Sequence, residues 1–164
     1  MEKLARTVGE HLKAAGAMLV TAESCTGGWV AQAVTSVAGC SEWFERGFVT
    51  YSDDAKRELI GVRPETLSRH GAVSEETARE MARGALEGSR GTLALAVTGV
   101  AGPGGGSAMK PVGTVCFAWA DKDGALKSET CNFHGDRESV RRQSVVHALQ
   151  GVLKLLTHGE RGAT

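Results

Sequence analysis

Two short apolar runs constrain the fold of this chain most: AMLVTA at residues 17–22 and LALAVT at residues 93–98. Both are apolar almost throughout, which is typical of central strands covered on both faces. Each leads directly into a glycine-rich segment, ESCTGG at 23–28 and GVAGPGGG at 99–106. Ligands of open α/β sheets bind beyond the carboxyl ends of parallel strands, so these two segments are the first places to look for a site.

Helical patterns alternate with the strand-like runs over most of the chain. Helices are predicted at 2–15, 29–37, 53–60, 64–70, 74–86 and 136–157. Further strands are predicted at 43–51, 112–120 and 125–133, the last two joined by an Asp123-Gly124 hairpin turn. The pattern predicts a three-layer α/β/α sandwich whose mixed, mainly parallel sheet has about five strands, one of them antiparallel. The tail HGERGAT is expected to be frayed.

Length and charge limit the class of protein. The 164 residues fit a single domain, taken as 1–164, and 19 basic residues balance 19 acidic ones. Nucleic-acid binding usually requires a basic excess, so no nucleic-acid partner is expected. No apolar run is long enough to cross a membrane, and the N-terminus lacks a signal peptide, which predicts a cytoplasmic protein. The four cysteines show no CxxC spacing or metal-site pattern, so no metal and no cofactor are expected.

The ESCTGG segment has the form of a strand-to-helix turn that exposes a nucleophile. Ser24 is the candidate nucleophile, and N–H groups at the following helix start can bind an anion or stabilise an oxyanion. The simpler interpretation is that the serine or threonine only caps the helix and the glycines only form the turn. Cys25 is a rival nucleophile, although no histidine is clearly placed to serve as its base.

Three other segments carry candidate chemistry. In TYSDDAKREL, Tyr51 falls at the end of a strand and Lys56 lies in the first turn of the next helix. A desolvated lysine can lose its proton and act as a base for a serine, although a solvated surface lysine is the ordinary interpretation of such a segment. The glycine loop after residue 98 offers N–H groups to an anion, or is only a connection between strands. In GDRESVRR, Arg137 and Arg141 share a helix face and suit phosphate binding, or pair with acids of the same helix.

Together these segments resemble the C-terminal domain family of the competence/damage-inducible protein CinA. The matching motifs are ESCTGG, VTYS, KxxLxGV, GAVSxExAxxMA, VTGxAGP and KPVGTV, which occur in that order between about residues 4 and 156. Stand-alone members are nicotinamide-nucleotide amidases, and the separate N-terminal domain of full-length CinA is not expected here. SAMKP and the additional glycines of GPGGG depart from the more usual form of the family.

The resemblance implies an amidohydrolase that converts nicotinamide mononucleotide (NMN) and water to nicotinic acid mononucleotide and ammonia without a metal. It implies three catalytic residues, with Ser24 as nucleophile, Lys56 as base, and Tyr51 close by to relay the proton or to hold Lys56 in place. The substrate-binding residues expected from the motifs and from the glycine loop are Cys25, Thr26, Gly27, Gly28, Thr98, Gly99, Gly102 and Arg137. A homo-oligomer, with a dimer favoured, is also expected.

Three alternatives differ in chemistry from a Ser–Lys amidase. A non-catalytic module of the same fold would bind a pyridine nucleotide or phosphate without turnover. A thiol hydrolase would use Cys25, and a structural or competence-related interaction protein would bind no small ligand. Replacing Ser24 and Cys25 separately distinguishes the Ser–Lys amidase from the thiol hydrolase.

Overall fold

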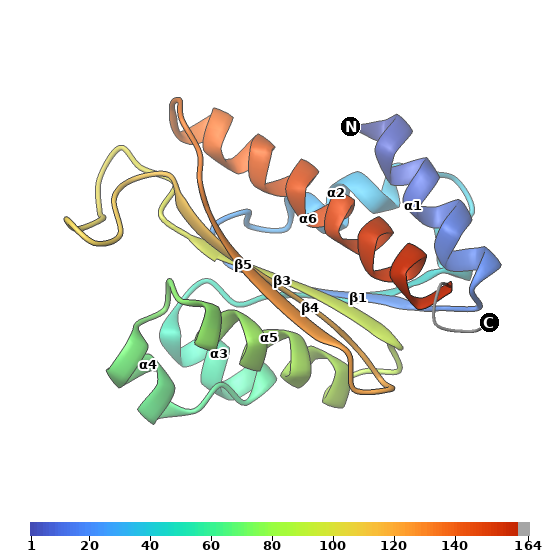
Figure 1. Cartoon of the computed structure of the whole chain (residues 1–164), viewed down its shortest axis with the longest axis horizontal. Helices are drawn as coiled ribbons and strands as arrows, with labels where there is room; N and C mark the ends of the chain where they lie inside the picture. Colours follow the sequence, from blue (N-terminus) through green and yellow to red (C-terminus); the bar gives the residue numbers. More distant parts are fainter. Residues whose placement is uncertain (161–164) are drawn as a thin grey trace.

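The computed structural model describes residues 1–160 and contains one five-stranded sheet with helices on both faces (Figure 1). The strands are β1 (Leu19–Glu23), β2 (Phe44–Val49), β3 (Leu93–Gly99), β4 (Thr114–Asp121) and β5 (Leu126–Asn132). The helices are α1 (Glu2–Ala14), α2 (Trp29–Thr35), α3 (Asp53–Ile60), α4 (Pro64–His70), α5 (Glu75–Glu87) and α6 (Arg137–Glu160), with a 3-10 turn at Cys40–Glu42. None of the described helices is long and apolar enough to cross a membrane.

The sheet has the strand order β2-β1-β3-β4-β5. β1 pairs in parallel with β2 and β3, whereas β4 pairs antiparallel with both β3 and β5. Only β4 therefore runs against the other four strands. This confirms the predicted mixed, mainly parallel sheet with one reversed strand.

The two faces of the sheet differ in the size of their side chains. Along β3, Leu93, Leu95 and Val97 belong to the core under α1, α2 and α6, while Ala94 and Ala96 face α5. This alternation follows from the period of two in a strand, and the small residues let α5 pack close to the sheet. The two apolar faces together produce the three layers of the sandwich (Figure 1).

Local capping sets the bounds of the helices around the site. α3 begins after Ser52, whose hydroxyl accepts a hydrogen bond from the Ala55 N–H at 3.0 Å, and ends at Gly61 with φ 66°. The left-handed backbone at Gly61 is a common helix stop. α6 continues to Glu160, so residues 158–160 are helical and the expectation of a frayed tail is wrong for them. The rest of that predicted tail, 161–164, lies outside the described residues.

Candidate active site

The carboxyl ends of the three parallel strands β2, β1 and β3 meet at one edge of the sheet. The Ser24 N–H donates to the Val97 carbonyl at 2.9 Å, and the Thr50 N–H donates to the Glu23 carbonyl at 2.8 Å. The backbone pairing thus extends one residue beyond β1, to Ser24, and one residue beyond β2, to Thr50. It brings ESCTGG, VTYS and VTGV together, as expected for ligand-binding segments of a parallel sheet.

Ser24 and Lys56 are in direct contact at this edge. The Lys56 Nζ lies 3.1 Å from the Ser24 Oγ, 2.9 Å from the Thr50 carbonyl oxygen and 3.2 Å from the Tyr51 carbonyl oxygen. The Lys56 side chain is only 1% exposed, so the interpretation as a solvated surface lysine is wrong. It enters the core from α3 because the strand end and the Ser52 cap place the helix start over the sheet edge.

The surroundings of Lys56 disfavour its charge. Burial lowers the pKa of the Lys56 ammonium below its ordinary value of 10.5, and the Asp53 carboxylate opposes only part of this effect. A neutral amine has two protons for the two carbonyl oxygens and a lone pair for the Ser24 hydroxyl. An ammonium has three protons for the same three oxygens. The three contacts therefore suit both protonation states without movement of the side chain.

Cys25, adjacent to Ser24, lacks the properties of a nucleophile. The cysteine is 6% exposed, and burial raises the pKa of its thiol to about 12, with the nearby Glu23 carboxylate acting in the same direction. A thiol with this pKa stays protonated at neutral pH, and it is the thiolate that attacks. The environment of Cys25 therefore favours Ser24 as the reacting group.

The Ser24 cavity, a hollow of about 220 Å³, opens beside the Ser24–Lys56 pair. Seven of the residues predicted from the sequence line it: Ser24, Cys25, Tyr51, Lys56, Thr98, Gly99 and Arg137. Ala72, Val73 and Ala101 complete the lining and had not been predicted. Thr26, Gly27, Gly28 and Gly102 are not among the lining residues of this cavity.

Tyr51 contributes to the site mainly through its backbone. Its carbonyl oxygen accepts from Lys56, while the residue is 65% exposed. Among the described residues, its phenol hydroxyl has no hydrogen-bond partner. The contact expected between Tyr51 and Lys56 is therefore made by the carbonyl group, and the ring lies at the edge of the cavity.

Glu23 supports the candidate site and was not predicted from the sequence. This fully buried carboxylate accepts from the Thr26 hydroxyl at 2.7 Å, the Val30 N–H at 2.8 Å and the Ala31 N–H at 3.1 Å. It thereby occupies the start of α2, which the sequence had suggested as an anion site. An acidic residue just before a glycine turn and a helix was the signal available in the sequence.

The N–H groups of this turn that could still bind a substrate are those that precede α2. The Gly27 N–H donates to the Ser24 carbonyl at 3.0 Å and is already used. Within residues 1–160, the N–H groups of Cys25, Thr26 and Gly28 have no hydrogen-bond partner. Three of the four expected oxyanion donors are thus available, although which of them face a substrate stays a prediction.

The two arginines at the start of α6 hold the two glycine segments. Arg141 donates to the Cys25 and Thr26 carbonyls, both at 3.1 Å, and its guanidinium carbon lies 5.3 Å from the centre of the Trp29 ring. Arg137 donates to the Gly102 carbonyl at 2.8 Å. The alternative of pairing within α6 applies instead to Arg142, which bonds Glu138 at 2.9 Å.

Thr98 likewise joins separate segments. Its buried hydroxyl donates to the Ala72 carbonyl at 2.8 Å, which ties the end of β3 to the segment before α5. This bond fixes one wall of the Ser24 cavity.

Comparison with known proteins agrees with this architecture and with the positions of its motifs. The family model described as the CinA C-terminal domain matches residues 1–156. The chain belongs to the CinA C-terminal domain family. Five of the six motifs of this CinA domain contribute residues to the lining of the Ser24 cavity, whereas KPVGTV contributes Lys110 and Thr114 to another groove.

Several relatives of this CinA domain have names that state an activity. The nicotinamide-nucleotide amidohydrolase PncC of Escherichia coli K12 is 57% identical over 148 residues, which cover 90% of each chain. The protein of the same name from Pseudomonas putida is 52% identical over 154 residues, covering 94% of this chain and 96% of its own. The crystal structure of competence/damage inducible protein CihA from Agrobacterium tumefaciens superposes with a TM-score of 0.92 at 48% identity, covering 94% of both chains.

Proposed function

We propose that this CinA domain hydrolyses the carboxamide of NMN, with Ser24 as nucleophile and Lys56 as general base. The observation that carries the proposal is the 3.1 Å contact between the Lys56 Nζ and the Ser24 Oγ in a site that keeps the amine 1% exposed. The relatives named nicotinamide-nucleotide amidohydrolase support the reaction, since they are identical to this chain at more than half of the aligned residues. The Ser–Lys mechanism is supported by the geometry alone.

In the first step, the neutral Lys56 amine takes the proton of the Ser24 hydroxyl as Oγ attacks the amide carbon. A C–O bond forms, and the π electrons of the carbonyl move to its oxygen. The unpaired N–H groups at Cys25, Thr26 and Gly28 are the donors available to that oxyanion. One such donor typically contributes about 3–4 kcal/mol to the transition state.

In the second step, the Lys56 ammonium returns its proton to the amide nitrogen as the C–N bond breaks and ammonia leaves. The acyl group stays on Ser24 as an ester. Water then attacks the ester while Lys56 accepts its proton, and the Ser24 oxygen recovers a proton as nicotinic acid mononucleotide departs. The three contacts of Lys56 serve both halves of this cycle.

The nucleotide part of the substrate needs more space than the Ser24 cavity provides. A neighbouring groove of about 770 Å³ shares Val73 with the cavity and is lined by Arg69, Arg79 and Lys110 as well as by Glu75 and Glu76. We place the carboxamide in the cavity, and the phosphate near Arg137 or beside Arg69 and Lys110 in the groove. Both places offer the charged donors that a phosphate requires.

The decisive experiment is ammonia release from NMN by the purified chain and two single-residue variants. Ser24→Ala should reduce the rate to background, while Cys25→Ala should retain most of it because that thiol is buried and protonated. Cys25→Ala is the matched control, as it alters the neighbouring position of the same turn. Full activity of Ser24→Ala would refute the Ser24 assignment.

The same samples test the alternative of a binding module. Calorimetric titration of NMN into wild-type protein measures binding independently of turnover. Binding without ammonia release would favour the non-catalytic module and contradict the proposed reaction.

The cytoplasmic location and the homo-oligomeric state stay predictions.

A further inference from the structure

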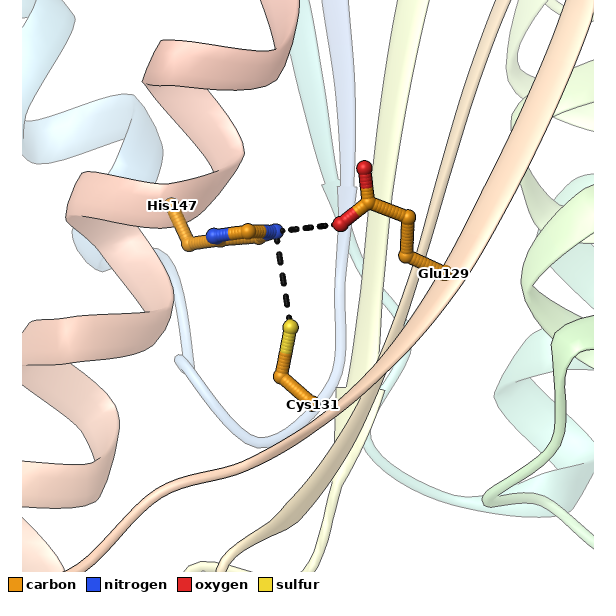
Figure 2. A group of neighbouring side chains, drawn as sticks. All are labelled: Glu129, Cys131 and His147. Carbon is orange, nitrogen blue, oxygen red and sulfur yellow. Dashed lines mark hydrogen bonds and ion pairs between the residues drawn. The ribbon is translucent and has the colours of Figure 1, made fainter.

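Glu129, Cys131 and His147 form a cluster that is separate from the Ser24 cavity. Glu129 and Cys131 are two residues apart on β5, so their side chains lie on the same face of the strand. That face packs toward α6, which contributes His147 (Figure 2). None of the three residues lines the Ser24 cavity.

Both neighbours of His147 approach the same ring nitrogen. The His147 Nε2 lies 2.8 Å from the Glu129 Oε2 and 3.5 Å from the Cys131 Sγ, as the dashed lines in Figure 2 show. A Cys–His–carboxylate relay needs one ring nitrogen for the thiol and the other for the carboxylate. Convergence on a single nitrogen therefore does not fit a proton relay.

A shared cation requires instead that the three ligand atoms lie close enough to surround one point. The three ligand atoms, one oxygen, one nitrogen and one sulfur, all lie within 4.8 Å of one another. In a tetrahedral zinc site with metal–ligand distances of about 2.0–2.3 Å, neighbouring ligand atoms lie about 3.3–3.8 Å apart. The 3.5 Å contact of His147 with Cys131 matches this separation, and the 2.8 Å contact with Glu129 would lengthen slightly around an ion. We propose that Glu129, Cys131 and His147 bind one zinc-type divalent cation, with water in the fourth position.

The charge and rigidity of the cluster support this assignment. Glu129 as carboxylate and Cys131 as thiolate, after loss of its proton to solvent, would balance the two positive charges of the ion. The His147 ring is held between aromatic rings, with centroids at 4.6 Å from Phe117 and 6.1 Å from Phe133. A ligand whose orientation is fixed by packing loses little entropy when the ion binds.

An ion can reach the cluster from solvent. The side chain of His147 is 22% exposed and that of Glu129 is 44% exposed. His147 also lines a hollow of about 310 Å³, together with Phe133 and Gln150.

The position of the site indicates what the ion would do. It would join the edge strand β5 to α6, whose first turns hold the nucleophile segment through Arg141. None of the steps proposed for amide hydrolysis uses the ion. The inference is thus independent of the proposed function, and its test is metal binding rather than activity.

The test is a calorimetric titration of Zn²⁺ into the full chain after treatment with a chelator. We expect one equivalent to bind to the wild type, and at least about tenfold weaker binding in both Cys131→Ser and His147→Gln. Cys40→Ser is the matched control, because Cys40 is another partly buried thiol outside the cluster, and it should bind as the wild type does. Absence of stoichiometric binding by the wild type, or equal binding by all variants, would overturn the proposal.

A second measurement compares the absorption spectra of the wild type and the two cysteine variants after Co²⁺ is added. Co²⁺ bound through a thiolate gives a sulfur-to-metal charge-transfer absorption band, which ligands without sulfur do not produce. The band should appear in the wild type and in Cys40→Ser, and be missing from Cys131→Ser. A band that persists in Cys131→Ser would place the metal on another cysteine and contradict the assignment.

Discussion

At the scale of single residues, Lys56 carries most of the chemical argument. Its ammonium would be buried with no carboxylate in hydrogen-bond contact, since its three partners are a hydroxyl and two carbonyl oxygens. Burial penalises the charged form more strongly than these neutral partners compensate, so the pKa falls. A residue that is normally a cation is thereby prepared to accept a proton.

The pH dependence of activity tests this role of Lys56. The reaction needs neutral Lys56 in the free enzyme, so kcat/KM should rise with pH through a midpoint below 10.5. Lys56→Arg should lower kcat by several orders of magnitude at every pH, because arginine keeps its proton in proteins. Ammonia release measured across pH gives both results.

Arg57 offers a matched control on the next position of α3, where it is exposed and pairs with Asp54. Arg57→Lys should leave the pH profile unchanged. A near-normal rate for Lys56→Arg would mean that the residue supplies only positive charge.

The candidate residues that sequence could identify are those that combine a reactive group with a distinctive local motif. Ser24 lies in a glycine turn after a strand, and Lys56 early in a capped helix, so both could be singled out. Their 3.1 Å contact depends on three strand ends meeting, which no local pattern encodes. His147 was missed for a similar reason, because its partners lie on β5 and have no sequence spacing typical of a metal site.

At the scale of elements, the nucleophile segment is fixed from two sides. The Glu23 carboxylate bonds the start of α2 and the Thr26 hydroxyl, while Arg141 of α6 bonds the carbonyls of Cys25 and Thr26. The short helix α2 would otherwise have two buried N–H groups without partners. The turn is therefore held by side chains from β1 and α6.

Glu23→Gln tests the support given by this carboxylate. An amide has one oxygen in place of two, so at least one of the three donors loses its partner. We expect the free energy of unfolding to fall by about 1–3 kcal/mol, with kcat reduced more than KM is changed, because Ser24 is displaced. Chemical denaturation and steady-state ammonia release measure the two effects.

Glu58→Gln is the matched control, since Glu58 is exposed on α3. It should leave both stability and kcat unchanged. A Glu23→Gln variant as stable and active as the wild type would show that the carboxylate is dispensable.

The bounds of a helix or strand could be predicted where residues next to its ends mark them in the sequence. α3 and α4 were predicted with the observed bounds, because Ser52, Gly61 and Pro64 mark their ends in the sequence itself. The predicted strand at 43–51 was longer than β2, which ends at Val49, since residues 50 and 51 use their carbonyls for Lys56. These two carbonyl groups bond a lysine side chain in place of a neighbouring strand. The contact depends on the tertiary structure, so no local sequence pattern predicts it.

At the scale of the whole molecule, the buried amine should reduce stability. Its pKa is lower in the folded chain than in the unfolded one, so the unfolded chain binds more protons between these two values. The free energy of unfolding therefore rises with pH across that window. The destabilisation by the buried ammonium is fully present below the pKa that Lys56 has in the folded chain. A site suited to base catalysis thus weakens the protein at neutral pH.

Lys56→Met should for this reason be inactive and more stable than the wild type at neutral pH. The gain should shrink as pH approaches 10.5, where the lysine is neutral in both states. Chemical denaturation at several pH values, with Arg57→Met as an exposed control, provides the comparison. A destabilised Lys56→Met at neutral pH would contradict the proposed cost of burying the amine.

Two of the three oxygen atoms around the Lys56 amine belong to the main chain, at Thr50 and Tyr51. Amino-acid exchange at these two positions cannot delete a carbonyl group. The contacts of the Lys56 amine should therefore tolerate wide variation of side chains at positions 50 and 51. They should be lost after insertion or deletion of a single residue between the end of β2 and Lys56. Related proteins that keep this site should therefore keep a constant number of residues in that connection.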